Sequence, residues 1–273
     1  MKCYNCGKEL TKQTKTKEHI PAQAYFVGYG DEYKLNRITV PACYPCNQKY
    51  SKIDNEIRDA LGVINESDEK QKELSRKAAK SILQNIKGRT NRLHFDESGN
   101  IEAVEFNYND FKTLAIKDFK GLFYKKYGFP LPKNWKVEII ADFENNSNLD
   151  AAKAGLLAYL NKDTQWSKSG HLDIFSYKLK ALTPDENGDI TDGKNIENTK
   201  SFASVQVYHD RISFIVVAAR KKYLNKLEKG DIPPSKKKKS KRTNKEKNKI
   251  KMENLKRKLG KKRLCKNKRQ QKK

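Results

Sequence analysis

Two Cys-x-x-Cys pairs near the N-terminus constrain the fold of this chain more than any other feature. The first pair is Cys3 and Cys6, and the second is Cys43 and Cys46. A gap of two residues lets both cysteines of a pair turn towards one ion, and four thiolates complete the tetrahedral shell that zinc prefers. Disulfides or unligated buried cysteines are the alternatives. We predict a structural zinc site that joins the two pairs.

Cysteine usage and the absence of apolar stretches favour a reducing compartment. Lys2 leads directly into Cys3 and polar residues, unlike a signal peptide. No apolar run approaches the ~20 residues that a membrane-spanning helix needs, so we expect no membrane partner. In a reducing compartment, paired cysteines favour metal over disulfide. The expected location is the cytoplasm of a bacterium or of a phage-infected host.

Positive charge is concentrated towards the C-terminal end of the chain. The sequence has 273 residues and a formal net charge of +26. Residues 235–273 contain 21 lysines and arginines against two glutamates, a net of +19, which leaves +7 for the other 234 residues. Such a segment cannot bury enough apolar surface to fold alone. We predict a disordered, lysine-rich tail over residues 231–273.

Apolar spacing sets a small N-terminal module apart from a larger body. Residues 38–43 alternate as a short strand, and residues 47–61 are predicted to form a helix with apolar residues four apart on one face. Few apolar residues lie in this part, so a metal would have to replace part of its core. We assign residues 1–61 to a zinc-stapled module.

The body, residues 62–230, is predicted to be mixed α+β with an antiparallel sheet. Helical spacing with a serine N-cap and glycine stops predicts helices, and alternating apolar residues between turn signals predict strands. The expected helices are residues 68–87, 110–127 and 149–160, with Ser67 as the first N-cap and Gly88 and Gly128 as stops. The expected strands are residues 93–95, 103–108, 135–143, 172–182, 202–208 and 212–218, with His209, Asp210 and Arg211 turning the last two into a hairpin.

His19 lies between the cysteine pairs in a setting that suits phosphate chemistry. Glu18 precedes it, and Asn47 follows the last cysteine of the second pair. A carboxylate oxygen and an amide oxygen are hard ligands suited to Mg²⁺ or Mn²⁺. A neighbouring histidine can take a proton from water. A surface or packing role is the alternative for His19. We assign that role to the other histidines, which lack spaced partners: His94, His171 and His209.

These residues resemble the HNH endonuclease family, whose members have a ββα-metal fold with zinc knuckles. The resemblance rests on the two cysteine pairs, on residues 18–21 (Glu-His-Ile-Pro) and on residues 40–47 (Val-Pro-Ala-Cys-x-x-Cys-Asn). It implies that His19 is the general base that activates water. It also implies that Glu18 and Asn47 hold one Mg²⁺ or Mn²⁺ ion at the scissile phosphate. Zinc would be structural, DNA would be the substrate, and the products would carry a 5′-phosphate and a 3′-hydroxyl.

Two positions differ from the family pattern. The family usually has aspartate where this chain has Glu18, whose side chain is one methylene longer. The middle asparagine of the family has no counterpart in register, and either the nearby Asn36 or a backbone carbonyl would orient His19. Two other functions stay open. One is a non-catalytic zinc module that binds nucleic acid, for example a regulator, and the other is a nuclease that cuts RNA with the same residues.

The basic tail is predicted to hold nucleic acid through phosphate contacts. Clustered lysines and arginines release counterions from a polyanion, which gives strong, salt-sensitive, sequence-independent affinity. The tail has no aromatic residues, so we expect no base stacking from it. A solubilising tail and a nuclear localisation signal have the same composition and stay open. The clustered residues are Lys236, Lys237, Lys238, Lys239, Lys256, Arg257, Lys258, Lys261, Lys262 and Arg263.

Overall fold

The computed structural model describes residues 1–64, 72–85, 88, 92–142, 151–161, 165–184, 190–191, 199 and 201–221. The described residues all belong to one compact unit, Met1–Asn225. This unit is mixed α+β with antiparallel sheets, as the sequence predicts. Within the described residues, no helix has the length and apolar character needed to cross a bilayer. The basic tail lies outside the described residues, so its disorder and its phosphate contacts stay predictions.

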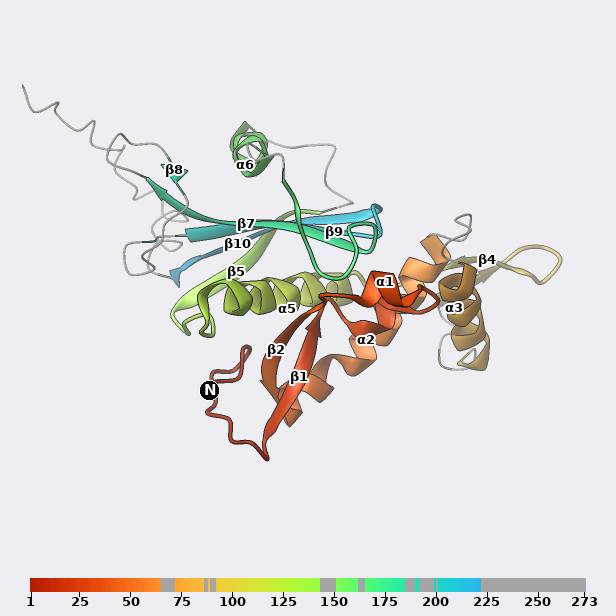
Figure 1. The fold of residues 1–273 in the computed structure, drawn as a ribbon. Helices are drawn as coiled ribbons and strands as arrows, with labels where there is room; N and C mark the ends of the chain where they lie inside the picture. Colours follow the sequence, from red (N-terminus) through yellow and green to blue (C-terminus); the bar gives the residue numbers. More distant parts are fainter. Residues whose placement is uncertain are drawn as a thin grey trace, which may run out of the picture. The chain divides into compact units, whose positions relative to one another are not determined.

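The N-terminal part contains two antiparallel strands followed by a long helix (Figure 1). Strand β1 (Lys15–Ile20) pairs with β2 (Ile38–Cys43), and helix α2 (Tyr44–Ile64) follows at once. The connection between the strands holds a 3-10 turn, η1 (Gln23–Phe26), and a single helical turn, α1 (Asp31–Lys34). The prediction of a strand running into Cys43 is confirmed. Apolar spacing did not predict strand β1, whereas the resemblance to ββα-metal proteins implies two strands before the helix.

Helix α2 begins at Tyr44, three residues before the predicted start, so that Cys46 lies in its first turn while Cys43 ends β2. Helix α3 (Lys72–Gln84) packs against α2 through Leu74, Ala78 and Ile82, which recur every four residues and are buried. Gly62 allows this close approach, since a Cβ there would lie 2.6 Å from that of Ala78. The predicted N-cap at Ser67 lies outside the described residues.

A hairpin and a third helix follow. Strands β3 (Leu93–Phe95) and β4 (Ile101–Val104) pair as the predicted hairpin. The bounds of the second strand differ from the prediction of residues 103–108: β4 begins two residues earlier and ends at Val104, and Tyr108 begins the next helix. Helix α5 (Tyr108–Tyr127) begins at an N-cap, Asn107, whose side chain accepts a hydrogen bond from the Asn109 N–H group. It ends at Gly128, which has the left-handed conformation expected of a glycine stop (φ 81°). The predicted helix over residues 110–127 is confirmed.

The body contains an antiparallel sheet in the order β5-β10-β9-β7-β6, with β8 (Ile190–Thr191) paired to β7. Strands β9 and β10 form the predicted hairpin, and its turn residues His209 and Asp210 have positive φ. Helix α5 lies on one face of the sheet, and α6 (Ala151–Asn161) lies on the other (Figure 1). The strand bounds are Trp135–Asp142 (β5), Ser167–Lys168 (β6), Phe175–Pro184 (β7), Ser201–Tyr208 (β9) and Ile212–Arg220 (β10).

Helix α5 connects the N-terminal part to the sheet. One cluster of buried side chains extends from Cys3 through Phe119 to Phe202. Gly121 lets the helix approach β1 closely, because a Cβ at this position would collide with the side chain of Ile20. The predicted boundary between residues 61 and 62 falls within α2, and the shared core extends across it. Both parts therefore contribute to any site at the junction of β1, α2 and α5.

A buried carboxyl group on α5 makes stability depend on pH. Burial raises the pKa of Asp118 to about 7, although Lys117 and a 2.8 Å hydrogen bond from the Tyr208 hydroxyl act to lower it. Because the pKa is higher in the folded than in the unfolded state, protonation favours folding. The resulting stabilisation is complete below the unfolded pKa of ~3.9 and is lost as the pH rises to about 7.

We therefore expect Asp118→Asn to flatten the pH dependence of stability. Between pH 5 and pH 8, the wild-type protein should lose about 2 to 3 kcal/mol of unfolding free energy relative to the variant. Urea unfolding of both proteins at the two pH values measures this difference. An equal change in both proteins would contradict the assignment to Asp118.

Candidate functional site

Four cysteines converge in the N-terminal part and form a candidate metal centre. Their Sγ atoms all lie within 4.8 Å of one another, and none of them is in a disulfide. The Sγ atoms of Cys6 and Cys43 are 3.8 Å apart. Two sulfurs bound to one zinc at ~2.3 Å in tetrahedral geometry would have about this separation. The predicted cluster of Cys3, Cys6, Cys43 and Cys46 is confirmed, and its geometry fits zinc.

The local backbone explains this convergence. Cys3 and Cys6 lie in a turn that a hydrogen bond from the Gly7 N–H group to the Cys3 carbonyl closes at 3.0 Å. Gly7 has φ 76°, a conformation that glycine adopts without strain. Cys43 ends β2, and Cys46 lies in the first turn of α2. A strand end and a helix start therefore present the second pair to the first.

The thiols of this centre differ in acidity. Burial acts to raise the pKa of Cys3, but backbone N–H groups of Cys6, Cys43 and Asn5 lower it to about 7. Burial raises the pKa of both Cys6 and Cys46 above the ordinary value of a thiol. Because zinc binds thiolates, a metal has to displace protons from these two side chains.

The three residues predicted to act on phosphate line one cavity of about 380 Å³. Glu18 and His19 come from β1, and Asn47 comes from the first turn of α2. The side chain of Glu18 is buried, whereas those of His19 and Asn47 are partly exposed. Residues 22–24 and the exposed face of α2, including Ser51, complete the wall. The structure thus brings Asn47 together with Glu18 and His19, which lie 29 and 28 positions earlier in the chain.

Lys117 of α5 lies beneath this cavity and pairs with two carboxylates. Its Nζ atom is 3.0 Å from Oε1 of Glu18 and 2.8 and 2.9 Å from the two carboxylate oxygens of Asp54 on α2. The side chain of Lys117 is fully buried, and those of Glu18 and Asp54 are only 5% and 14% exposed. Such buried pairs are stable only while both signs of charge are present.

Negative charge exceeds positive charge in this buried group. Burial raises the pKa of Glu18 and Asp54, although Lys117 lowers both. Burial acts to lower the pKa of Lys117, but Asp54, Asp118 and Glu18 raise it above its ordinary value. The two carboxyl groups of Glu18 and Asp54 therefore contact one ammonium. Oε2 of Glu18 is buried and has no hydrogen-bond partner among the described residues. An unpartnered oxygen in a cavity wall with excess negative charge fits a bound cation.

The imidazole of His19 is suited to accept a proton at neutral pH. Burial lowers its pKa, and the positive charges of Arg37, Lys117 and Lys17 lower it further. The ring is therefore neutral near pH 7 and has a nitrogen lone pair for a proton. The positive charges of Lys17 and Arg37 would attract an anionic substrate to this part of the surface.

The sequence alone did not identify Lys117 and Asp54 as part of this site. Asp54 had a local signal, because helical spacing places it on the same face of α2 as Asn47 and Ser51. Lys117 had no such local signal, because its partner Asp54 is 63 positions away in the chain.

The middle asparagine of the HNH pattern still has no clear counterpart. Asn36 lies in the turn before β2 with φ 56°, and Thr39 is the residue opposite His19 in the strand pair. Within the described part of the chain, no hydrogen bond joins Asn36 to His19. The remaining histidines lie away from this cavity: His94 pairs with Glu105 at 2.7 Å, His171 lies 3.4 Å from Asp173, and His209 is buried beside Tyr29.

Apart from the four cysteines, no group of three potential metal ligands among histidine, cysteine, aspartate and glutamate occurs in the described residues. Comparison of the chain with protein-family models, with curated proteins and with solved structures finds no match. The functional argument therefore rests on the residues of this chain and on their arrangement.

Proposed function

We propose that this protein is a metal-dependent endonuclease that hydrolyses phosphodiester bonds in DNA. The observation that carries the proposal is the meeting of Glu18, His19 and Asn47 in one cavity, with Asn47 directly after a cysteine of the metal centre. Two strands followed by a helix, joined by two cysteine pairs, form the arrangement that the HNH resemblance leads us to expect.

His19 is assigned the role of general base. Its neutral imidazole accepts a proton from water as the water oxygen attacks phosphorus. The bond between phosphorus and the 3′-oxygen breaks, and that oxygen leaves and takes up a proton from solvent. The products carry a 5′-phosphate and a 3′-hydroxyl. Lys17 and Arg37 supply positive charge near the same ring, which favours a phosphate there.

Glu18 and Asn47 are assigned to hold Mg²⁺ or Mn²⁺ through a carboxylate oxygen and an amide oxygen. When bound, the cation would offset the negative charge that develops on the phosphate. Lys117 is a positioning residue, because it holds one oxygen of Glu18 and leaves Oε2 without a partner in the cavity wall. Zinc in the four-cysteine centre would be structural, since sulfur fills all four positions.

The proposal is tested by incubating the zinc-loaded protein with supercoiled plasmid, single-stranded DNA and RNA. Each substrate is offered Mg²⁺, Mn²⁺ or EDTA, at a salt concentration that suppresses aggregation by the basic tail. We expect nicking of DNA with either cation and none with EDTA. Cleavage of RNA alone would replace the DNA substrate by RNA. Binding without cleavage of any substrate would reject the enzyme.

The second candidate is a non-catalytic zinc module that binds nucleic acid, for example a regulator. One observation favours it: Glu18, the proposed cation ligand, is already paired with Lys117 at 3.0 Å. Such a module would bind DNA equally well in EDTA-free buffer with or without added Mg²⁺. The first function predicts instead that the added cation produces new DNA ends.

Removal of the basic tail is expected to weaken nucleic-acid binding without preventing cleavage. A chain ending at Pro234 lacks 21 lysines and arginines. Each lost phosphate contact should reduce the slope of log affinity against log salt by ~0.9 on duplex DNA. Fluorescence anisotropy across a salt series measures that slope. An unchanged slope would favour the alternative of a solubilising tail.

A further inference from the structure

A second and larger cavity adjoins the candidate site. Its volume is about 670 Å³, and it lies between α2 and α3 near the start of β3. Asn55 of α2 lines both this cavity and the cavity of His19. Apart from Gly88, every residue of its wall is polar or charged. We call it the basic groove and define it by Lys52, Asn55, Lys77, Lys80 and Arg92.

The basic groove carries excess positive charge. Five lysines and arginines and two carboxylates line it, which gives a net charge of +3. Arg92 lies 3.4 Å from Glu56, and Arg58 pairs with Asp59, so the opposite charges within each of these ion pairs cancel. The remaining charge comes from three exposed side chains: Lys52, Lys77 and Lys80.

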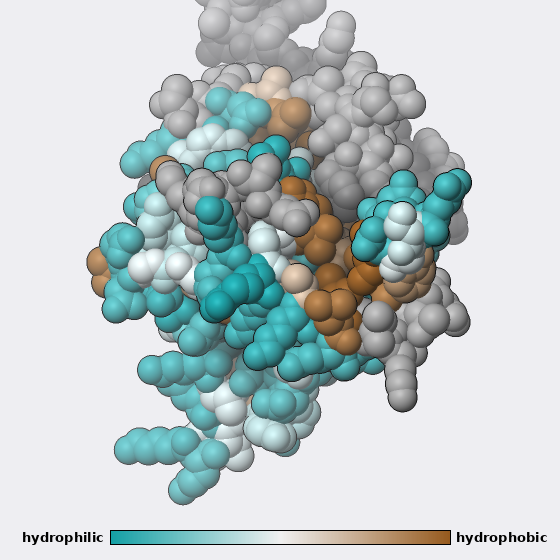
Figure 2. Space-filling view, turned by 90° about the vertical axis from the view of Figure 1, so that its right-hand side faces the viewer, coloured by the Kyte–Doolittle hydropathy of each residue, from teal (hydrophilic) through white to brown (hydrophobic). Residues whose placement is uncertain are grey.

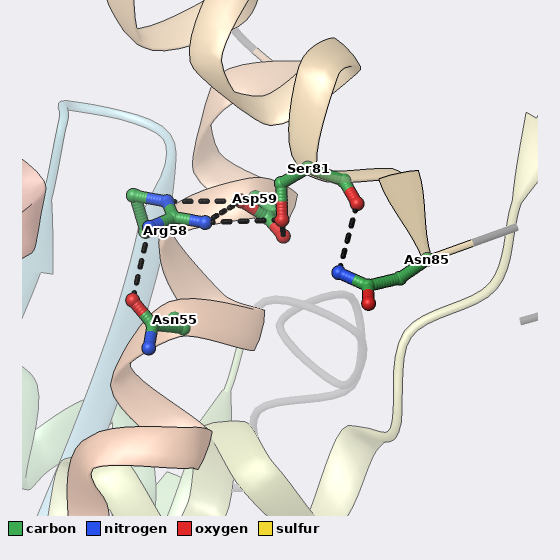
Figure 3. A network of polar contacts seen from close by, with 5 residues as sticks. All are labelled: Asn55, Arg58, Asp59, Ser81 and Asn85. Atoms are coloured by element: carbon green, nitrogen blue, oxygen red, sulfur yellow. Dashed lines mark hydrogen bonds and ion pairs between the residues drawn. The ribbon is translucent and has the colours of Figure 1, made fainter. Parts of the chain in front are cut away.

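A partly buried network of polar contacts joins residues in the wall of this groove (Figure 3). The Arg58 guanidinium donates to Asp59 at 2.9 Å and to the Asn55 side-chain oxygen at 2.9 Å. The Ser81 hydroxyl of α3 donates to Asp59 at 2.7 Å and accepts from Arg58 at 3.2 Å. The network ties α3 to α2, and Asn55 is thereby held at the wall that the two cavities share. Lysines on both helices are kept at opposite sides of the groove.

The neighbouring surface differs from this groove in its chemistry. Another cavity, of about 390 Å³, is lined mostly by apolar residues, including Val63, Ile82 and Leu83. Figure 2 views the molecule from the α3 side and shows a largely hydrophilic described surface with apolar side chains gathered in one area. Nothing in the structure indicates what would cover that apolar area. The basic groove, in contrast, has a net positive charge, which favours a negatively charged ligand.

We propose that the basic groove binds the sugar–phosphate backbone of the nucleic acid strand whose neighbouring phosphate is cut at His19. This inference rests on the proposed function, because it takes the cavity of His19 as the point of cleavage. Three positive charges in excess favour several phosphates of one polymer. The wall contains no aromatic residue, so bases are not stacked there, and the contact does not depend on sequence. Continuity through Asn55 lets one strand contact both cavities.

A photoreactive side chain gives a local test that the basic tail does not obscure. The full-length, zinc-loaded protein carries a benzophenone side chain in place of Gln84, an exposed residue of the groove wall. A second protein carries it in place of Gln165, which is exposed and does not line the groove. We expect crosslinks to a DNA oligonucleotide from position 84 and at least tenfold fewer from position 165. Equal yields would overturn the proposal.

Charge reversal tests the same inference by affinity. The double variant Lys77→Glu/Lys80→Glu is compared with Lys133→Glu/Lys168→Glu, which changes exposed lysines outside the groove by the same net charge. The groove variant should lose the crosslink at position 84. It should also reduce the salt slope on duplex DNA by at least ~1.8, corresponding to two phosphate contacts. The control variant should keep the crosslink. Equal slopes and crosslinks in the two variants would overturn the proposal.

Competition separates a polymer from a small anion. Inorganic phosphate and a mononucleotide are added at concentrations equal to the oligonucleotide phosphate. If either abolishes the crosslink as effectively as unlabelled oligonucleotide, the groove is a site for a small phosphate ligand, and the proposal is wrong. The crosslink does not require cleavage. Cleavage without the crosslink would therefore reject the groove alone, and the crosslink without cleavage would reject the proposed nuclease alone.

Discussion

Replacement of Cys46 by serine is expected to abolish metal binding and to unfold the N-terminal part of the protein. In small zinc domains, the metal contributes about 10 to 16 kcal/mol of folding free energy, which is comparable to the total stability of most domains. The sulfurs of Cys3 and Cys43 would then be buried without an ion between them. We expect zinc content to fall from one ion per chain to none. The thermal midpoint should fall by at least about 10 °C.

Cys265 provides the matched control for this prediction. It is the fifth cysteine of the chain and belongs to the predicted tail. Cys265→Ser should keep one zinc per chain and an unchanged thermal midpoint. A Cys46→Ser protein with full zinc content and normal stability would contradict the four-sulfur centre.

Replacement of Lys117 by methionine is expected to cost about 3 to 5 kcal/mol of unfolding free energy. Methionine keeps much of the side-chain volume but removes the charge. Glu18 and Asp54 would then be left buried without the ammonium that both contact. Urea unfolding measures the loss. Lys125→Met on the exposed side of the same helix is the control and should change stability by less than ~0.5 kcal/mol.

A triple variant separates the lost charge pair from lost packing. If Glu18→Gln and Asp54→Asn are combined with Lys117→Met, neither of the carboxylates that contacted Lys117 is left unpaired, and most of the stability should return. A triple variant as unstable as Lys117→Met would show that the cost comes from packing. A loss below about 1 kcal/mol in Lys117→Met would contradict the buried ion pair itself.

The metal centre and most of the helices could be predicted from the sequence because their signals are local. Cysteines two residues apart need only a turn to face one ion, and α3 and α5 show buried residues at helical spacing. Strand β1 could not be found in this way. Its two buried positions are Glu18 and Ile20, so a charged residue occupies a core position and breaks the apolar alternation. The buried carboxylate of Glu18 is stabilised by its ion pair with Lys117, which lies on α5, far away in the sequence.

The candidate site was predictable in part for the same reason. Glu18, His19 and Asn47 were selected by their chemistry and by their place beside the cysteine pairs, and they line one cavity. The place of Lys117 in the site depends on how α5 packs against α2, and the basic groove depends on how α3 packs against α2. The spacing of residues along the chain does not predict either packing. Gly121 and Gly62 are the sequence features that permit these close approaches, but a glycine does not reveal which helix will approach it.

Cleavage of supercoiled plasmid by the wild type and by His19→Ala tests the central claim most directly. Both zinc-loaded proteins are compared in Mg²⁺ or Mn²⁺ at equal DNA occupancy, with zinc content and thermal midpoint measured alongside. The wild type should nick the plasmid. His19→Ala should be at least ~100-fold slower while binding DNA equally well, because a general base contributes about 10² to 10⁴ in rate. Equal nicking by both proteins would contradict the assignment of His19 as the base.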